Sequence, residues 1–363
     1  MRYYIIAGEA SGDLHGSNLI KGILKHDEEA VFRFWGGDKM SALIGDPVKH
    51  IKDLAFMGFY EVIKHLPTIF KNIEFCKKDI IYFKPDVVIL IDYPGFNFRL
   101  FDFIKANNFR LYYYISPQLW AWKKGRVKQI KKYVDRMYVI FPFELDFYAQ
   151  NGLEVHYFGH PLLDELGEVS PVDKREEIVA LLPGSRKQEI SRMLPIYNSV
   201  AHRFPNLNFQ VAAMSVLGEG FYDQFITAPN ITICLDQTYK ILNKAKAALV
   251  TSGTATLETA LHQVPQIICY KSSMLSYNLA LWLVKGISYI GIVNLIMNRA
   301  IVKELIQDHA NAISISEELE ELMIGPKRET ILKDYSLLRK LLGEKGSSER
   351  VAKDMVSHLL MSK

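Results

Sequence analysis

The sequence predicts an α/β protein of two domains, each a parallel sheet covered by helices. Short apolar runs typical of buried strands alternate with helical stretches, which is the order of elements in parallel sheets. This alternation runs from residue 3 to about residue 158 and starts again at residue 178. A chain of 363 residues is also too long for one ordinary hydrophobic core.

The composition is that of an ordinary globular protein, with 49% hydrophobic and 23% charged residues. The net charge of +4 is mild for this length, so we expect no nucleic-acid partner. The three cysteines, at positions 76, 234 and 269, lie far apart and predict neither a disulfide framework nor a zinc site. The chain opens on a strand without a signal-peptide pattern, which predicts a cytoplasmic protein with reduced thiols.

One long apolar stretch, residues 272–300, has the composition of a membrane span. Lys285 and Gly286 divide it near the middle, and neither part reaches the ~20 apolar residues that a span needs. We therefore expect a buried helix followed by a loop, and a lipid-facing surface is the alternative.

The first strand, residues 3–7, leads through small residues into a helix expected over residues 14–25. Glu9, Asp13 and His15 bring polar groups to the carboxyl end of this strand, where parallel sheets bind ligands. The Gly-x-Gly-x-x-Gly spacing is absent, so a dinucleotide site is not predicted.

The clearest buried strand of the first half, residues 87–91, delivers Asp92 to the mouth of the sheet. A carboxylate there can act as a general base, and the alternative is that it caps the helix expected near Phe98. A later loop, residues 116–122, carries two tryptophans that can line a sugar or lipid pocket or simply pack.

Two segments predict either packing or a lipid contact. The apolar cluster of residues 56–60 fits a core as well as an exposed patch. Residues 123–136 hold seven basic residues and one acid, and Lys124, Lys128 and Lys131 share one helical face. A solvated face is the ordinary explanation, and docking on anionic lipid is the alternative, since each basic residue adds about 1 kcal/mol at a charged membrane.

A phosphate-type loop opens the second half. The strand of residues 178–182 ends at Gly184, and Ser185 is expected to cap the next helix. Such a turn presents backbone N–H groups and the positive end of a helix dipole, and Arg186 adds a fork suited to phosphate. Taken alone, this motif also fits an ordinary strand-to-helix loop with a surface arginine.

A second loop of this type, residues 251–258, follows the strand at 247–250. Its hydroxyls and free N–H groups suit a diphosphate, and Glu258 either accepts hydrogen bonds from a ribose or only benefits from the helix dipole. The Gly-x-x-x-x-Gly-Lys loop is missing, which argues against a kinase or an ATPase. Residues 302–307 predict a short helix.

Six motifs in order along the chain resemble the lipid-A-disaccharide synthases, glycosyltransferase family 19. They lie at residues 8–13, 116–122, 159–161, 181–186, 252–258 and 302–307. One departure from the family pattern occurs at Gly95, where the family usually has an aspartate. Asp92 and Asn97 of the same motif are retained.

The resemblance implies a GT-B fold, in which two Rossmann-like parallel-sheet domains face each other across a cleft. Residues 1–165 are expected to bind the acceptor and lipid, residues 175–345 the UDP-sugar, and the helix of residues 346–363 can cross back to the first domain. The implied reaction is an inverting transfer of 2,3-diacylglucosamine from UDP onto 2,3-diacylglucosamine 1-phosphate (lipid X), which gives a β-1,6 disaccharide 1-phosphate and UDP.

The implied location is the cytoplasmic face of the inner membrane, as a peripheral protein of lipid A and lipopolysaccharide biosynthesis. A homodimer, the preferred acyl-chain length and the strength of membrane attachment are left open.

The expected roles are as follows. Asp92 is the catalytic base. The UDP-sugar contacts Gly184, Ser185, Arg186, Ser252, Gly253, Thr254, Glu258 and Asn294. The acceptor contacts Glu9, Ser11, Gly12, Asp13, His15, Asn97, Ser116, Gln118 and Trp120. Acyl chains and membrane contact Phe56, Met57, Phe59, Tyr60, Lys124, Lys128 and Lys131. No cofactor or metal is expected, since Arg186 and helix dipoles can stabilise the departing diphosphate.

Two other functions fit the same residues. One is another UDP-sugar enzyme of this fold, such as a UDP-N-acetylglucosamine 2-epimerase or a glycosyltransferase with a different acceptor. The other is a non-catalytic lipid- or nucleotide-binding module, against which the retained Asp92, Arg186 and Glu258 argue.

Overall fold

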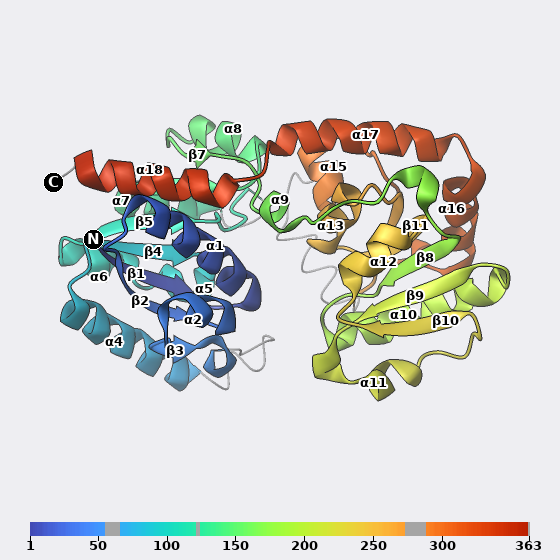
Figure 1. Cartoon of the computed structure of the whole chain (residues 1–363), viewed down its shortest axis with the longest axis horizontal. Coiled ribbons are helices and arrows are strands. Elements are labelled where there is room, and N and C mark those ends of the chain that lie inside the picture. The colour runs from blue at the N-terminus through green and yellow to red at the C-terminus, as the bar shows by residue number, and fades with distance from the viewer. Residues whose placement is uncertain (55–65, 121–123, 273–287, 362–363) are drawn as a thin grey trace. The chain divides into compact units, whose positions relative to one another are not determined.

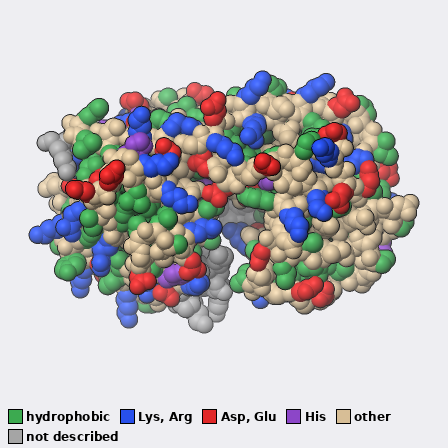
Figure 2. Space-filling view, in the orientation of Figure 1, with side chains coloured by type: hydrophobic (Ala, Val, Ile, Leu, Met, Phe, Trp, Pro, Cys, Tyr) green, Lys and Arg blue, Asp and Glu red, His purple; other side chains and the backbone are tan. Residues whose placement is uncertain are grey.

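The computed structural model describes residues 1–54, 66–120, 124–272 and 288–361. They form two compact units (Figure 1): Met1–Glu165 with Leu342–Lys363, and Leu166–Leu341. Each unit is built around one parallel sheet, so the predicted α/β class with two Rossmann-like domains is confirmed. On the face drawn in Figure 2, Lys and Arg side chains stand among Asp and Glu side chains, in keeping with the mild net charge.

The first unit contains a seven-stranded sheet in the order β3-β2-β1-β4-β5-β6-β7, and every neighbouring pair is parallel. Its strands are β1 (Arg2–Ala7), β2 (Val31–Gly36), β3 (Lys49–His50), β4 (Val87–Ile91), β5 (Arg110–Tyr114), β6 (Arg136–Val139) and β7 (His156–Tyr157). Its helices are α1 (Ala10–His26), α2 (Asp38–Ile44), α4 (Leu66–Phe83), α5 (Pro94–Asn97), α6 (Phe101–Ala106), α7 (Val127–Tyr133), α8 (Phe143–Gln150), α9 (Leu162–Glu165) and α18 (Ser347–Met361), with short 3-10 turns η1 (Ile51–Asp53) and η2 (Lys124–Arg126).

Both faces of this sheet are covered, which is why its central strand β4 is apolar at every position. On β1, Tyr4 and Ile6 enter one buried cluster, and Tyr3 and Ile5 enter the cluster on the opposite face. The second cluster includes the apolar side of α18, which packs against α1 (Figure 1). Gly22 permits this approach, because a Cβ there would lie 2.7 Å from the Cβ of Ala352. The C-terminal helix therefore crosses back to the first domain, as predicted.

The second unit contains a six-stranded parallel sheet in the order β10-β9-β8-β11-β12-β13. Its strands are β8 (Ile178–Leu182), β9 (Asn208–Ala213), β10 (Ile231–Leu235), β11 (Ala247–Thr251), β12 (Gln266–Tyr270) and β13 (Glu304–Ile306). Its helices are α10 (Lys187–Arg203), α11 (Glu219–Asp223), α12 (Thr238–Lys244), α13 (Ala255–Leu261), α15 (Ile292–Met297), α16 (Ala312–Ile324) and α17 (Lys327–Leu342), with 3-10 turns η3 (Val172–Lys174), η4 (Ser215–Leu217) and η5 (Gln307–His309).

The strand order reverses once in each sheet, and that place determines where a ligand can bind. The reversal falls between β1 and β4 in the first unit and between β8 and β11 in the second. The loops that leave the carboxyl ends of two such strands run in opposite directions and open a crevice for ligands. Asp92 follows β4, and the two predicted phosphate loops follow β8 and β11.

The structure differs locally from the predicted elements. The helix predicted over residues 302–307 is wrong: Glu304–Ile306 is the edge strand β13, paired with β12, and η5 follows it. Helix α1 begins at Ala10, earlier than predicted, so the loop after β1 is only two residues long.

Within the apolar stretch of residues 272–300, residues 273–287 lie outside the described residues and residues 292–297 form α15. No described helix combines the length and the apolar content that crossing a membrane requires.

Candidate active site

The turn that follows β4 holds Asp92 in an unusual backbone conformation. Asp92 and Tyr93 have φ angles of +44° and +47°, in the left-handed region that residues other than glycine seldom adopt. The Asp92 carbonyl accepts hydrogen bonds from Asn97 Nδ2 at 2.7 Å and from the Tyr113 hydroxyl at 2.5 Å. Strained turns of this kind persist where surrounding contacts fix them, and they cluster at functional sites.

Gly8 is required because the Tyr93 ring occupies the space beside it. A Cβ at Gly8 would lie 2.3 Å from Tyr93 ring atoms, and the same ring stacks on Phe96 with centroids 5.5 Å apart. Tyr93 thus packs on the loop after β1, so that it connects the loops after β1 and β4 on the two sides of the switch point. Sequence reasoning missed Tyr93 and Tyr113. Tyr93 lies inside the recognised motif, whereas Tyr113 is one of three consecutive tyrosines and gave no signal.

The surroundings of Asp92 favour its protonated form. Burial, and then the nearby carboxylate of Glu9, raise the pKa of Asp92 to about 6, while a hydrogen bond from the Tyr93 backbone lowers it in part. A general base works best with a pKa close to the working pH, because it is then ionised and still accepts a proton readily. Asp92 fits that requirement at neutral pH.

The same pKa predicts that Asp92→Asn stabilises the protein. The pKa of Asp92 is about 6 in the folded chain and 3.8 normally. The free energy of unfolding therefore falls as pH rises from about 4 to 6, and the full destabilisation by the buried charge is present above pH 6. Removing the charge should raise the free energy of unfolding at pH 7.5 by about 1–3 kcal/mol. The gain in the free energy of unfolding of Asp92→Asn over the unaltered protein should disappear near pH 4. Urea unfolding at both pH values measures it, and an equal change at both would contradict this origin.

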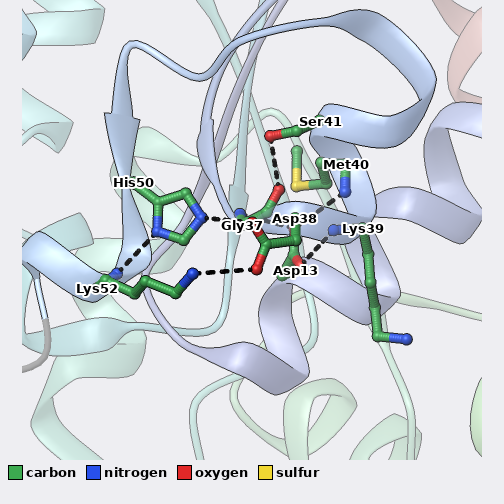
Figure 3. A network of polar contacts seen from close by, with 8 residues as sticks. All are labelled: Asp13, Gly37, Asp38, Lys39, Met40, Ser41, His50 and Lys52. Atoms are coloured by element: carbon green, nitrogen blue, oxygen red, sulfur yellow. Dashed lines mark hydrogen bonds and ion pairs between the residues drawn. The ribbon is translucent and has the colours of Figure 1, made fainter.

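The carboxylate of Asp13 caps a helix (Figure 3). Asp13 is buried, and its Oδ1 accepts hydrogen bonds from the backbone N–H of Gly37 at 2.7 Å and of Met40 at 3.1 Å. Its Oδ2 accepts from the N–H of Lys39 at 3.0 Å. These are free donors at the start of α2. Asp13 therefore has a structural role within the first unit, and its predicted contact with the acceptor stays a prediction.

The other residues predicted for the acceptor differ in exposure. Glu9, Ser11 and Gln118 are exposed, whereas Gly12, Asn97 and Ser116 are buried. His15 is half-buried on α1, and burial lowers its pKa to about 4, so its imidazole is neutral at pH 7.

The loop after β5 is held by internal contacts. The Ser116 hydroxyl lies 2.5 Å from the Tyr148 hydroxyl, and the Trp120 ring meets Phe143 edge-on at 5.0 Å. Sequence reasoning missed Glu144, whose carboxylate accepts the backbone N–H groups of residues 140 and 141. Burial raises the pKa of Glu144 to about 7. Ser116 and Trp120 therefore shape the loop, and their predicted role toward the acceptor stays a prediction.

The residues predicted to meet the membrane are covered only in part. Phe56, Met57, Phe59 and Tyr60 lie outside the described residues. Lys124 begins η2, and Lys128 and Lys131 are exposed on α7. The two lysines on α7 can therefore reach a partner in solution or at a surface.

In the second unit, a pocket of about 370 Å³ lies at the switch point. Its lining includes all but one of the residues predicted for the nucleotide-sugar: Gly184, Ser185, Arg186, Ser252, Gly253, Thr254 and Glu258. The two predicted phosphate loops thus meet at one cavity.

The loop after β8 depends on a glycine and on a carboxylate that sequence reasoning missed. Gly184 has φ +109°, and a Cβ there would lie 2.6 Å from Glu189 Oε2. Glu189 accepts the backbone N–H groups of Ser185 and Arg186, at 3.2 and 3.3 Å. Helix α10 begins at Lys187 with Arg186 at its N-cap, so the prediction of Ser185 as the N-cap is wrong. A Glu three residues after the N-cap is the signal that could have identified Glu189.

Asn294 has a structural role in the second unit. It is fully buried in α15; its Nδ2 donates to the Val302 carbonyl at 3.0 Å and to Glu304 Oε1 at 2.8 Å. Its Oδ1 accepts the N–H groups of Ile301 and Val302. Both hydrogens and both lone pairs of its amide are thus used within the second unit, and the predicted contact of Asn294 with the nucleotide-sugar stays a prediction.

A second pocket, of about 580 Å³, adjoins the first, since Thr238 and Glu258 line both. Its other lining residues are Asp236, Gln237, Tyr239 and Lys240. Burial raises the pKa of Glu258, and a hydrogen bond with Tyr239 opposes this shift. Sequence reasoning missed the segment 236–240, which contains no recognisable motif. In the described ranges, no group of three or more His, Cys, Asp or Glu side chains could hold a metal ion.

Two parallel-sheet units with these switch-point loops define the class of the protein, the GT-B α/β proteins. The S. aureus MnaA–UDP co-structure superposes with a TM-score of 0.70 at 12% identity, covering 99% of this chain and 97% of that chain.

The family follows from sequence comparison. A family model described as lipid-A-disaccharide synthetase matches residues 3–357. The lipid-A-disaccharide synthase of Syntrophus aciditrophicus is 40% identical over 96% of this chain and 95% of its own length. That of Geobacter metallireducens is 38% identical over 97% and 95%. The chain belongs to the lipid-A-disaccharide synthase family, which confirms the predicted family and the predicted enzyme class, a hexosyltransferase of lipid A biosynthesis.

Proposed function

We propose that the chain transfers 2,3-diacylglucosamine from UDP to the 6-hydroxyl of 2,3-diacylglucosamine 1-phosphate, with inversion. The products are the β-1,6 disaccharide 1-phosphate and UDP. Membership of the family over nearly the whole chain supports the reaction. The observation that carries the mechanism is the Asp92 turn, which places a carboxylate of raised pKa at the ligand-binding edge of the first sheet.

The donor occupies the second unit in this proposal. Its diphosphate lies against the loops after β8 and β11, where backbone N–H groups, helix N-termini and Arg186 attract negative charge. Glu258 accepts hydrogen bonds from the ribose. The nucleoside lies in the adjoining pocket lined by residues 236–240, next to the same Glu258.

The acceptor is activated from the first unit. Asp92 takes the proton of the 6-hydroxyl as the oxygen attacks the anomeric carbon from the face opposite UDP. The new C–O bond forms while the bond to the β-phosphate oxygen breaks, and the negative charge that develops there is stabilised by Arg186 and the loop N–H groups. We propose that no metal and no cofactor takes part.

We propose further that the protein works at the cytoplasmic face of the inner membrane, where acylated sugars reside. Replacing Lys124, Lys128 and Lys131 with alanine should lower binding to anionic liposomes roughly tenfold or more, because each basic residue contributes about 1 kcal/mol at such a surface. Sedimentation with phosphatidylglycerol vesicles measures the loss, and uncharged phosphatidylcholine vesicles are the control. Unchanged binding to the anionic vesicles would contradict the proposal for this segment.

The experiment that tests the reaction is acceptor-dependent release of UDP. We expect UDP from UDP-2,3-diacylglucosamine only when lipid X is added. A 2-epimerase would change the sugar without needing an acylated acceptor, and a non-catalytic module would release no UDP with both substrates present.

A further inference from the structure

Glu189 occupies the place where the loop after β8 would hold a phosphate. Its carboxylate accepts the N–H groups of Ser185 and Arg186, at 3.2 and 3.3 Å, and pairs with the Arg186 guanidinium at 3.2 Å. Its side chain also fills the space that the missing Cβ of Gly184 leaves. Part of the donors that the proposed function assigns to a diphosphate, those of the loop after β8, are thus taken by a carboxylate of the protein itself.

These contacts are long and reach an open cavity. The Arg186 side chain is 72% exposed and that of Glu189 is 24% exposed, and both residues line the pocket at the switch point. Charge-assisted hydrogen bonds are normally shorter, at about 2.7–2.9 Å for a cation and a carboxylate. The carboxylate therefore holds the loop loosely enough to be displaced by an anion of higher charge.

A bound diphosphate and Glu189 cannot both take the backbone N–H groups of Ser185 and Arg186. Two anions a few ångströms apart repel each other in a partly enclosed site, and each N–H group has one hydrogen to give. This inference rests on the proposed function. We propose that the carboxylate of Glu189 occupies the position of the donor's diphosphate at the loop after β8 when no UDP-sugar is bound. It holds the empty loop in shape, yields the N–H groups and Arg186 when the UDP-sugar binds, and takes them again as UDP leaves. Glu189 is thus a positioning residue that favours product release.

A capping residue alone would behave differently. Glu at this position commonly caps a helix, and such a cap only stabilises the first turn of α10. Loss of a simple cap would lower the unfolding temperature and would leave UDP affinity unchanged or weaker. Loss of a competing anion makes UDP bind more tightly.

The test is Glu189→Gln, which keeps the capping acceptor and removes the charge, so that the variant is expected to fold. We expect calorimetry to show a roughly 3- to 10-fold lower Kd for UDP, since one like charge is removed from a partly exposed site. The Kd for uridine, which lacks phosphate, should not change. The control is Glu320→Gln on α16, which changes the net charge equally outside the pocket lining and should leave both constants as they are.

Steady-state kinetics give a second measurement. UDP as a product inhibitor should show a Ki lower by the same factor in Glu189→Gln, and kcat should fall if UDP release limits turnover. Unchanged or weaker UDP binding in a folded variant overturns the inference and leaves the proposed function intact. Absence of UDP binding to the unaltered protein overturns both.

Discussion

Asp92→Asn is expected to lower kcat by about 10²–10⁴-fold, the usual contribution of a general base. The amide cannot take a proton from the acceptor hydroxyl, while the turn keeps the hydrogen bonds that the Asp92 backbone makes. Affinity for UDP should stay near that of the unaltered protein, because the proposed donor site is the pocket at the switch point of the second unit, which Asp92 does not line. Steady-state kinetics with both substrates and calorimetry with UDP separate the two effects.

The matched control for this substitution is Asp102→Asn, an exposed aspartate on α6 of the same unit. It removes the same charge and should leave kcat as it was. In the unaltered protein, kcat/KM should fall as pH drops through about 6, where Asp92 becomes protonated. Near-normal turnover of Asp92→Asn would remove Asp92 from the role of base.

Arg186→Ala is expected to lower kcat/KM by about 10²–10³-fold, since the guanidinium lines the pocket at the predicted phosphate loop and acts on charge that grows in the transition state. Part of the loss should appear in donor binding, because a charge-assisted hydrogen bond contributes about 1.5–3 kcal/mol. Initial rates over a range of UDP-sugar concentrations measure both components.

Arg186→Lys keeps the charge and loses the planar fork, so it should recover only part of the activity. Equal activity of the alanine variant and the unaltered protein would show that the diphosphate does not lie at this loop. Arg186 would then be the ordinary surface arginine that its short motif also allows.

The sequence alone predicted those elements of the fold that show a strong hydrophobic periodicity or a buried apolar run. Strands such as β4 and β8 are uninterrupted and apolar because both faces of each sheet are covered, and the loops after them could be placed at the ligand edge from that fact alone. The strand β13 was missed because three residues at a sheet edge show no period that distinguishes a strand from a helix.

The structural contacts that the sequence did not reveal have a common physical origin. Asp13 and Asn294 lie close to predicted ligand loops, yet both satisfy backbone groups within their own unit, which only the folded backbone reveals. Tyr93 and residues 236–240 reach the two sites through tertiary packing without a motif of their own. Glu189 follows the N-cap by three residues, a spacing that signals a capping residue, but its contacts with Ser185 and Arg186 depend on the conformation of Gly184.

The most direct test of the central claim is the product formed from UDP-2,3-diacylglucosamine and lipid X. After incubation with the purified protein, mass spectrometry should show a disaccharide 1-phosphate whose mass equals that of the two substrates less UDP, with one UDP released for each disaccharide. UDP released without a disaccharide, or a sugar nucleotide altered at unchanged mass, would contradict the account.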